Sequence, residues 1–217
     1  MIGKSITFNS AVLGIFALCT AGVVAITHEA TKTKIEDAKQ RAAQAALSEI
    51  IPPSEHDNDL FADTVPVLED YREFLGLTEE ADRDKTIHIA RQHQQPIAAI
   101  IPTIAKDGYS GDIKMILGVN ADGTIAGLRV TDHHETPGLG DYIDVKKSNW
   151  ILSFTGKDIT SNFDEKQQVN LVTGEKFDQL TGATITRKAV TRQVKKTLSY
   201  FQIASPLDAS DQPNQAP

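Results

Sequence analysis

An uncharged and mostly apolar stretch near the N-terminus limits what this chain can fold into more than any other feature. The 21 residues 6–26 carry no charged side chain, and the only charged side chain before them is Lys4. A helix of that length can span the hydrocarbon core of a bilayer. A cleaved signal peptide is the competing interpretation, but no clear cleavage site of small residues follows the stretch. We therefore predict that residues 1–27 form a short tip and an uncleaved transmembrane anchor.

The charge and the cysteine content narrow the possible functions of the remaining chain. Residues 28–217 carry 21 Lys and Arg against 29 Asp and Glu side chains, and an acidic domain repels a phosphate backbone. We therefore expect no nucleic-acid partner. The single cysteine, Cys19, lies in the apolar stretch and cannot alone form an internal disulfide, a zinc site or an iron–sulfur site. Redox chemistry in this chain would need an organic cofactor.

The spacing of apolar residues and the positions of prolines predict a linker helix and then an α+β domain. Apolar residues recur near the helical period in residues 31–51, and Pro52-Pro53 ends the pattern, so residues 28–53 are expected to form a linker helix. The acidic stretch 54–84 is expected to be loop, with a short helix around 68–77. The domain is predicted to occupy residues 54–204, followed by a disordered tail at 205–217.

Apolar runs in the second half of the chain predict antiparallel strands followed by a helix. The turn Asn120-Ala121-Asp122-Gly123 between two β-rich runs is typical of a hairpin. One helix is expected at 184–202, with Ile185, Ala189, Val190, Val194, Leu198 and Phe201 on one face. The predicted strands are 86–90, 97–101, 113–119, 124–131 and 168–172.

The first of two candidate functional motifs runs from Asp178 to Thr186 and reads Asp-Gln-Leu-Thr-Gly-Ala-Thr-Ile-Thr. Gly182 permits a tight turn, and Thr184 is placed near the start of the predicted helix. Free N–H groups and the positive end of the helix dipole favour a phosphate at such a position. A threonine that simply caps the helix is the competing interpretation.

The second motif runs from His133 to Asp141 and reads His-His-Glu-Thr-Pro-Gly-Leu-Gly-Asp. Its residue types are compatible with a metal site, but neighbouring side chains on a strand point to opposite faces, so His133 and His134 would diverge. A strand end that runs into a Pro-Gly turn is the alternative.

The first motif resembles the flavinylation sequence of the RnfG and NqrC subunits, which belong to the FMN-binding domain family. The resemblance implies that an FMN transferase joins the phosphate of FMN covalently to Thr184. Arg187 departs from the pattern, because many members have a small residue or proline there. The other positions that match the family's motif are Asp178, Thr181, Gly182 and Ala183.

The second motif is similar to a loop that lies against the flavin in RnfG and its relatives. The resemblance implies hydrogen bonds to FMN from Glu135 and Thr136, and packing of Leu139 against the ring, with Gly138 in the same loop. Trp150 and Tyr142 are assigned no role, since aromatic side chains more often pack in a core or on a surface.

The resemblance covers nearly the whole chain and implies a subunit of an Rnf-type ion-translocating electron transport complex. The expected role is electron relay through covalent FMN, with other subunits of the complex as partners and no catalytic group of the chain's own. The implied location is the bacterial inner membrane, with a single span and the soluble domain facing the periplasm. The Lys and Arg residues after the anchor would instead favour the cytoplasm, although that rule is weak before a long domain.

Two functions of other classes remain open at this point. The chain could be an anchored scaffold without redox activity, in which the Thr-Gly-Ala-Thr stretch is an ordinary helix cap. It could also be a metal-dependent hydrolase that uses His133, His134 and Glu135.

Overall fold

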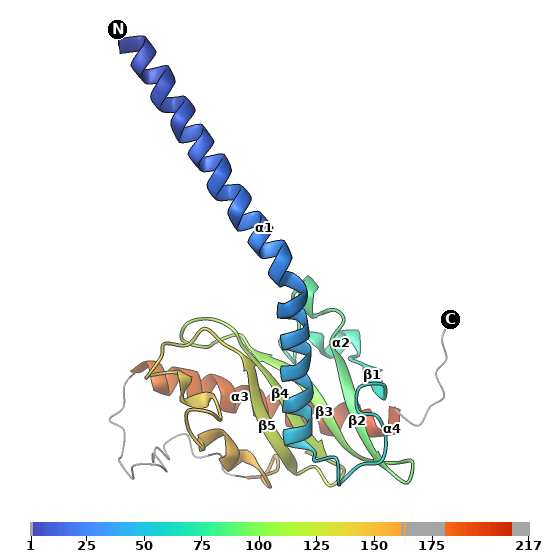
Figure 1. Ribbon diagram of the computed structural model, residues 1–217. Coiled ribbons are helices and arrows are strands. Elements are labelled where there is room, and N and C mark those ends of the chain that lie inside the picture. The colour runs from blue at the N-terminus through green and yellow to red at the C-terminus, as the bar shows by residue number, and fades with distance from the viewer. Residues whose placement is uncertain (1, 162, 164–180, 210–217) are drawn as a thin grey trace. The chain divides into compact units, whose positions relative to one another are not determined.

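The N-terminal part of the chain is a single long helix. The computed structural model describes residues 2–161, 163 and 181–209, and the chain divides into compact units at residues 1–45 and 46–217. Helix α1 (Ile2–Ile50) covers both the predicted anchor and the predicted linker helix (Figure 1). It ends just before Pro52-Pro53, as expected. Its segment Phe8–Lys32 is long and apolar enough to cross a membrane, by length and composition.

The second unit contains a five-stranded antiparallel sheet in the order β1-β2-β3-β4-β5. Four of the predicted strands are confirmed. Strand β1 was not predicted, because it has three residues, lies at the edge of the described sheet beside β2 and ends in a proline, which is tolerated at a sheet edge. The predicted strand at 168–172 lies outside the described residues. The strands are β1 (Thr64–Pro66), β2 (Thr86–Gln92), β3 (Gln95–Ala105), β4 (Ile113–Asn120) and β5 (Ile125–Asp132).

Two helical predictions need correction. Helix α3 (Thr181–Ala204) begins three residues before Thr184, so Thr184 lies within its first turn and not at its start. Helix α4 (Pro206–Ala209) forms where a disordered tail was expected, because Leu207 is buried in the core. Residues 210–217 lie outside the described part. The short helices are α2 (Glu69–Arg72), η1 (Glu80–Asp82), η2 (Asp141–Ile143) and η3 (Trp150–Phe154).

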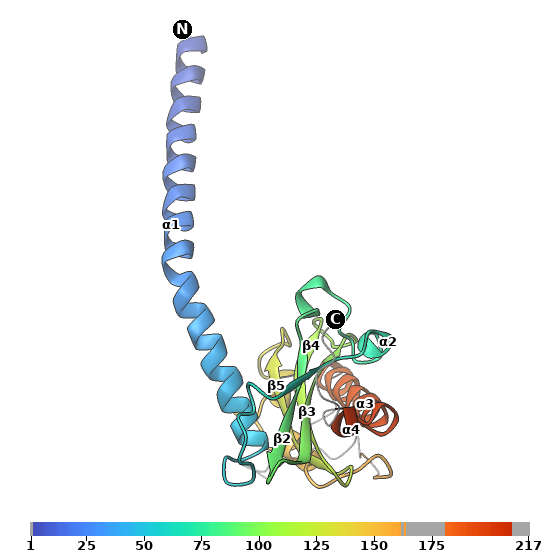
Figure 2. The ribbon, with the colours of Figure 1, turned by 90° about the vertical axis from the view of Figure 1, so that its right-hand side faces the viewer.

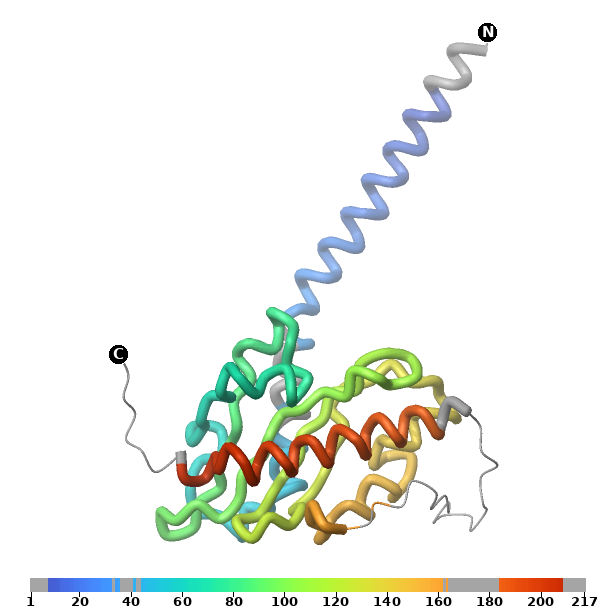
Figure 3. The backbone as a smooth tube through the Cα atoms, turned by 180° about the vertical axis from the view of Figure 1, so that it is seen from behind, coloured from blue at the N-terminus to red at the C-terminus, as the bar shows by residue number. Residues whose placement is uncertain are grey.

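Helix α3 lies across one face of the sheet and completes the larger hydrophobic core. Val190, Val194 and Leu198 are buried in the same cluster as sheet residues such as Leu117. Figure 3 shows α3 crossing the strands, with its first turns near the segment that carries η2 and η3. Ile185, which was predicted to share a helix face with these residues, is 38% exposed. Its neighbour Thr186 is instead fully buried.

The last turn of α1 packs against the opposite face of the sheet (Figure 2). Gly118 and Gly127 are register partners on β4 and β5. A Cβ atom on Gly118 would lie 2.2 Å from the Ile50 Cγ2 atom, and one on Gly127 would lie 3.4 Å from the Ile50 Cα atom. The paired glycines therefore form the hollow that receives Ile50.

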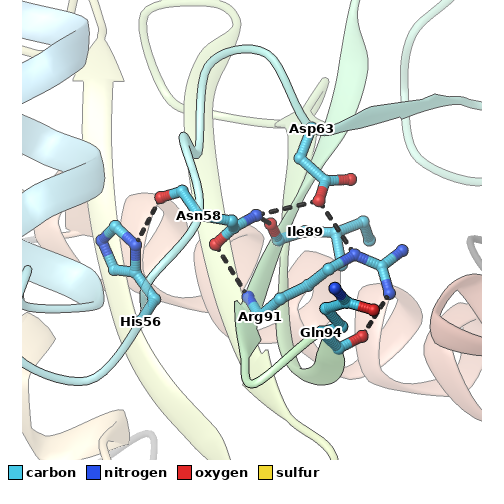
Figure 4. A network of polar contacts seen from close by, with 6 residues as sticks. All are labelled: His56, Asn58, Asp63, Ile89, Arg91 and Gln94. Carbon is cyan, nitrogen blue, oxygen red and sulfur yellow. Dashed lines mark hydrogen bonds and ion pairs between the residues drawn. The ribbon is translucent and has the colours of Figure 1, made fainter.

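A polar cluster, which we call the Asn58 network, fastens the loop after α1 to β2 (Figure 4). The Asn58 side-chain amide donates to Asp63 Oδ2 at 2.9 Å and to the Ile89 carbonyl at 2.8 Å, and its oxygen accepts from the Arg91 N–H at 2.9 Å. The Arg91 Nε atom also donates to Asp63 Oδ2 at 2.9 Å, and its Nη1 atom donates to the Gln94 carbonyl at 3.1 Å. Among the described residues, no buried side-chain nitrogen or oxygen of this cluster lacks a hydrogen-bond partner, so we interpret it as structural.

Candidate functional site

The two sequence motifs meet at the side chain of Glu135, which follows β5 and is 4% exposed. Its Oε2 atom accepts a hydrogen bond from the Thr186 hydroxyl of α3 at 2.5 Å. Its Oε1 atom accepts from the Ser110 backbone N–H, in the connection between β3 and β4, at 3.0 Å. One carboxylate therefore joins three segments that are distant in sequence. We call these groups the Glu135 network.

Two glycines make room for the Glu135 carboxylate. A Cβ atom on Gly140 would lie 2.6 Å from Glu135 Oε2 and 3.1 Å from the Thr186 hydroxyl oxygen. A Cβ atom on Gly108 would lie 2.8 Å from Glu135 Oε1 and 2.2 Å from the Gly111 carbonyl oxygen. Any larger residue at either position would push the segments apart. Glycine is thus required at both positions because the Glu135 carboxylate lies so close to the backbone there. Local sequence patterns do not reveal this contact.

The loop after Glu135 is a tight turn that is fixed at its end. The N–H groups of Leu139 and Gly140 both donate to the Thr136 carbonyl, at 3.1 and 3.0 Å. Gly138 has a φ of +77°, which favours glycine, and its N–H donates to the Asp141 side chain at 2.7 Å. Thr136 remains exposed and Leu139 half-buried. The turn therefore presents a hydroxyl and an apolar side chain beside the buried carboxylate.

Thr184 and Thr186 lie in one turn of α3 but in different environments. Thr186 is fully buried, and its hydroxyl binds Glu135. Thr184 is partly exposed. Successive helical residues are about 100° apart, so the two side chains point about 200° apart around the helix axis. Of these two residues, Thr184 is therefore the one with surface exposed to solvent.

Arg187 follows Thr186 and is buried, with 5% of its surface exposed. Its guanidinium carbon lies 5.5 Å from the ring centre of Trp150 in η3. Its Nη1 atom has no hydrogen-bond partner among the described residues. Burial lowers the pKa of Arg187, and the nearby Tyr142 partly offsets this effect. The sequence marked Arg187 only as a departure from the family pattern, because nothing local predicted its burial.

Some of the predicted site residues lie together in the structure, and others lie outside its described part. Glu135, Thr136, Gly138 and Leu139 lie in the turn that Glu135 fastens to α3. Thr181, Gly182 and Ala183 belong to the first turn of α3, but their side chains lie outside the described part, as does all of Asp178. The residues that sequence reasoning missed are Thr186 as the partner of Glu135, Ser110, Gly108 and Gly140.

The histidines of the second motif have different environments in the structure. His133 Nδ1 accepts a hydrogen bond from the Glu135 N–H at 3.1 Å, and His134 is exposed. Across the described residues, no three His, Cys, Asp or Glu side chains are grouped so that they could hold a metal ion. The Glu135 carboxylate is instead engaged by Thr186 and Ser110.

Two family models match the chain. The FMN-binding domain matches residues 108–199, which contain Glu135, Thr184 and Arg187. The RnfG N-terminal region matches residues 1–50, which correspond to α1.

Relatives of similar length align with most of this chain. The chain is 45% identical over 197 residues to the G subunit of the ion-translocating oxidoreductase complex of Vibrio atlanticus, covering 91% of this chain and 90% of that protein. It is 39% identical to the corresponding protein of Shewanella loihica, covering 91% and 90% of the two chains. The corresponding protein of Pseudomonas aeruginosa is 40% identical, with 91% and 89% covered.

Proposed function

Because this chain belongs to the family of G subunits of ion-translocating oxidoreductase complexes, a membrane electron-transport family with an FMN-binding domain, we propose that it carries FMN covalently on Thr184. FMN supplies one- and two-electron transfer when bound, and the protein supplies position and environment. The proposed role is electron relay between other subunits of an Rnf-type complex. No side chain is required as a general acid or base for that relay.

One observation carries the choice of Thr184. Thr184 and Thr186 share a helical turn, yet Thr186 is fully buried and bonded to Glu135, whereas Thr184 is partly exposed. An incoming phosphoryl group can reach Thr184 without breaking the Glu135 network. The N-terminal turn of α3 offers free N–H groups and the positive end of a 24-residue helix to the phosphate.

The attachment itself is a phosphoryl transfer with an FMN transferase as the maturation partner. The Thr184 hydroxyl oxygen forms a bond to the phosphorus of the FMN moiety, and the hydroxyl proton is lost. The phosphoanhydride bond of a flavin dinucleotide donor breaks, and a nucleoside monophosphate leaves. The product is a phosphodiester with one negative charge, equal to FMN plus protein less one water.

The residues that are present fit a flavin at this place. Thr136 offers an exposed hydroxyl and Leu139 a half-buried apolar side chain, both in the turn that Glu135 fastens to α3. A hydrogen bond from Glu135 to the flavin would compete with its bonds to Thr186 and Ser110. We therefore propose that Thr136 and Leu139 contact the flavin and that Glu135 chiefly holds their turn in place.

The attachment is tested with the full chain made together with an FMN transferase. We expect the wild type to fluoresce after denaturing electrophoresis and Thr184→Val to be dark, while Thr184→Ser regains the label because it restores a hydroxyl. Mass spectrometry should place one FMN, less one water, on the tryptic peptide that ends at Arg187. Thr186→Val is the matched control and should retain the label. A flavin on Thr181 or Thr186, or an unlabelled wild type, would contradict the assignment.

We also propose that α1 is a single membrane anchor and that the flavin domain faces the periplasm. The proposal rests on the family resemblance, since the Lys and Arg residues after the anchor favour the opposite orientation. A C-terminal alkaline phosphatase fusion should be active, and a reporter that works only in the cytoplasm should be inactive. The reverse pattern would place the domain in the cytoplasm and leave the attachment chemistry untouched.

A further inference from the structure

Arg187 is a buried cation, and one nitrogen of its guanidinium group has no hydrogen-bond partner among the described residues. It is 5% exposed, and its Nη1 atom is buried without a partner among the described residues. Within the same part of the chain, no carboxylate forms an ion pair with it. Buried donors are almost always satisfied in folded proteins, and an exception calls for an explanation such as a missing ligand.

The position of Arg187 on α3 directs it toward the flavin attachment point. Residues three apart on a helix are neighbours on its surface, and Arg187 is three residues after Thr184. Side chains on a helix also lean back toward its N-terminus. This position brings the Thr184 hydroxyl within the range that a long side chain at residue 187 can reach.

The ring of Trp150 restricts how the guanidinium can lie. The Arg187 Cζ atom is 5.5 Å from the Trp150 ring centre, a distance at which the cation is attracted to the ring. A guanidinium held in this way presents its remaining N–H groups in a fixed plane, which suits the oxygens of a phosphate. Lys188, the next cation on α3, is exposed.

We propose that Arg187 is the phosphate-binding residue of the attached flavin, donating from Nη1 to a free oxygen of the phosphodiester on Thr184. This inference rests on the proposed attachment at Thr184. Arg187 then neutralises the single negative charge of the diester and fixes the first bonds of the tether. The buried donor gains its partner only when the flavin is attached, so Arg187 stabilises the flavinylated protein selectively.

The test compares the full chain in detergent, made with and without FMN transferase, as wild type, Arg187→Met, Arg187→Lys and Lys188→Met. We expect flavinylation to raise the Tm of the wild type and of Lys188→Met, and to raise that of Arg187→Met much less. Without the transferase, Arg187→Met should be at least as stable as the wild type, because it removes an unsatisfied buried donor. The phosphorus-31 resonance of the diester should shift in Arg187→Met, and the fluorescence anisotropy of its flavin should fall.

The outcomes separate this proposal from the attachment on which it rests. An equal loss of Tm in Arg187→Met with and without flavin, and an unshifted phosphorus resonance, would show that Arg187 only packs on Trp150. If folded Arg187→Met is not labelled but Arg187→Lys is, a cation at the phosphate is required and the proposal is supported. Failure of both variants to be labelled would overturn it in favour of a contact with the transferase. An unlabelled wild type would overturn the attachment itself.

Discussion

The Asn58 network and the Glu135 network both fasten a loop to a regular element, but they differ in how completely their polar groups are paired. In the Asn58 network, the Arg91 guanidinium binds Asp63 and the Gln94 carbonyl, and the Asn58 amide uses both its nitrogen and its oxygen. In the region of the Glu135 network, the carboxylate is satisfied, but the adjacent Arg187 has a buried Nη1 atom without a partner among the described residues.

The difference separates a structural cluster from a binding site. A network that satisfies all its members specifies a fold and needs nothing from outside. A buried cation that the protein leaves partly unpaired costs stability unless a ligand supplies the partner. On this reasoning, changes in the Asn58 network should alter stability alone, and changes near Glu135 should alter stability and the flavin together.

The largest effect on stability is expected from Glu135→Ala. The substitution removes two hydrogen bonds to a buried carboxylate and leaves the Thr186 hydroxyl without that partner, which should cost about 3 kcal/mol of unfolding free energy. Because Thr184 is untouched, the protein should still be labelled, with an altered flavin absorption spectrum. Denaturant unfolding and absorption spectroscopy measure the two effects.

Glu135→Gln is the matched control for this prediction. The amide keeps the volume of the side chain and can still accept from the Ser110 N–H, so its loss of stability should be smaller. An Ala variant with unchanged stability would show that the carboxylate does not hold the three segments together. An altered stability with an unchanged flavin spectrum would place the flavin away from this turn.

Asn58→Ala should destabilise the domain without affecting the flavin. It leaves the Arg91 N–H and the Ile89 carbonyl without their side-chain partner, at a cost of about 2 kcal/mol. Labelling and the flavin spectrum should match those of the wild type when both proteins are folded. A shifted flavin spectrum would break the proposed separation between the two networks.

Local patterns predicted the sheet and α3 well, since their signals are carried by neighbouring residues. The hairpin of β4 and β5 has β-rich runs on both sides of an Asn-Ala-Asp-Gly turn, and its strands are confirmed. The Asn58 network joins residues that are about thirty positions apart, such as Asn58 and Ile89, and no local pattern encodes that contact. The stretch that contains Asn58 was therefore predicted only as an acidic loop.

The candidate site shows the same limit at single residues. Both motifs were recognisable because each is a continuous string, but the bond that joins them, from Thr186 to Glu135, spans 51 positions. The phase of α3 decides that Thr186 is buried and Ile185 is 38% exposed, the opposite of what their polarity suggests. The burial of Arg187 on Trp150 likewise depends on how η3 packs against the domain, and so it could not be predicted.

A smaller, pH-dependent effect is expected at His88, whose ring helps to dock the loop that contains the Asn58 network. Its Nδ1 atom lies 2.8 Å from the Leu60 carbonyl and must donate to it. Burial lowers the pKa of His88 from 6.5, the Leu60 hydrogen bond opposes this shift, and Lys85 adds to it. Below about pH 6.5 the unfolded state binds more protons than the folded state, so stability falls as pH falls.

The pH effect is measured as the difference in unfolding free energy between the wild type and His88→Gln across pH 5 to 8. The wild type should lose more stability than the variant as the pH falls from about 6.5. The loss should be smaller than that caused by Asn58→Ala, because His88 is only partly buried. Parallel curves would show that His88 titrates alike in the folded and unfolded states.

The smallest effect on unfolding free energy should come from Glu49→Gln. This variant tests a third arginine, Arg129, which forms an ion pair with an exposed glutamate. Arg129 Nε lies 2.8 Å from Glu49 Oε2, but the Glu49 side chain is 54% exposed, so water and salt screen the pair. Arg129 also donates to the Leu128 carbonyl at 2.8 Å and keeps that partner in the variant. We expect a loss of about 0.5 kcal/mol that shrinks further in high salt. A loss as large as that of Asn58→Ala would mean that exposure does not distinguish these arginines, and it would weaken the argument that the burial of Arg187 makes its missing partner significant.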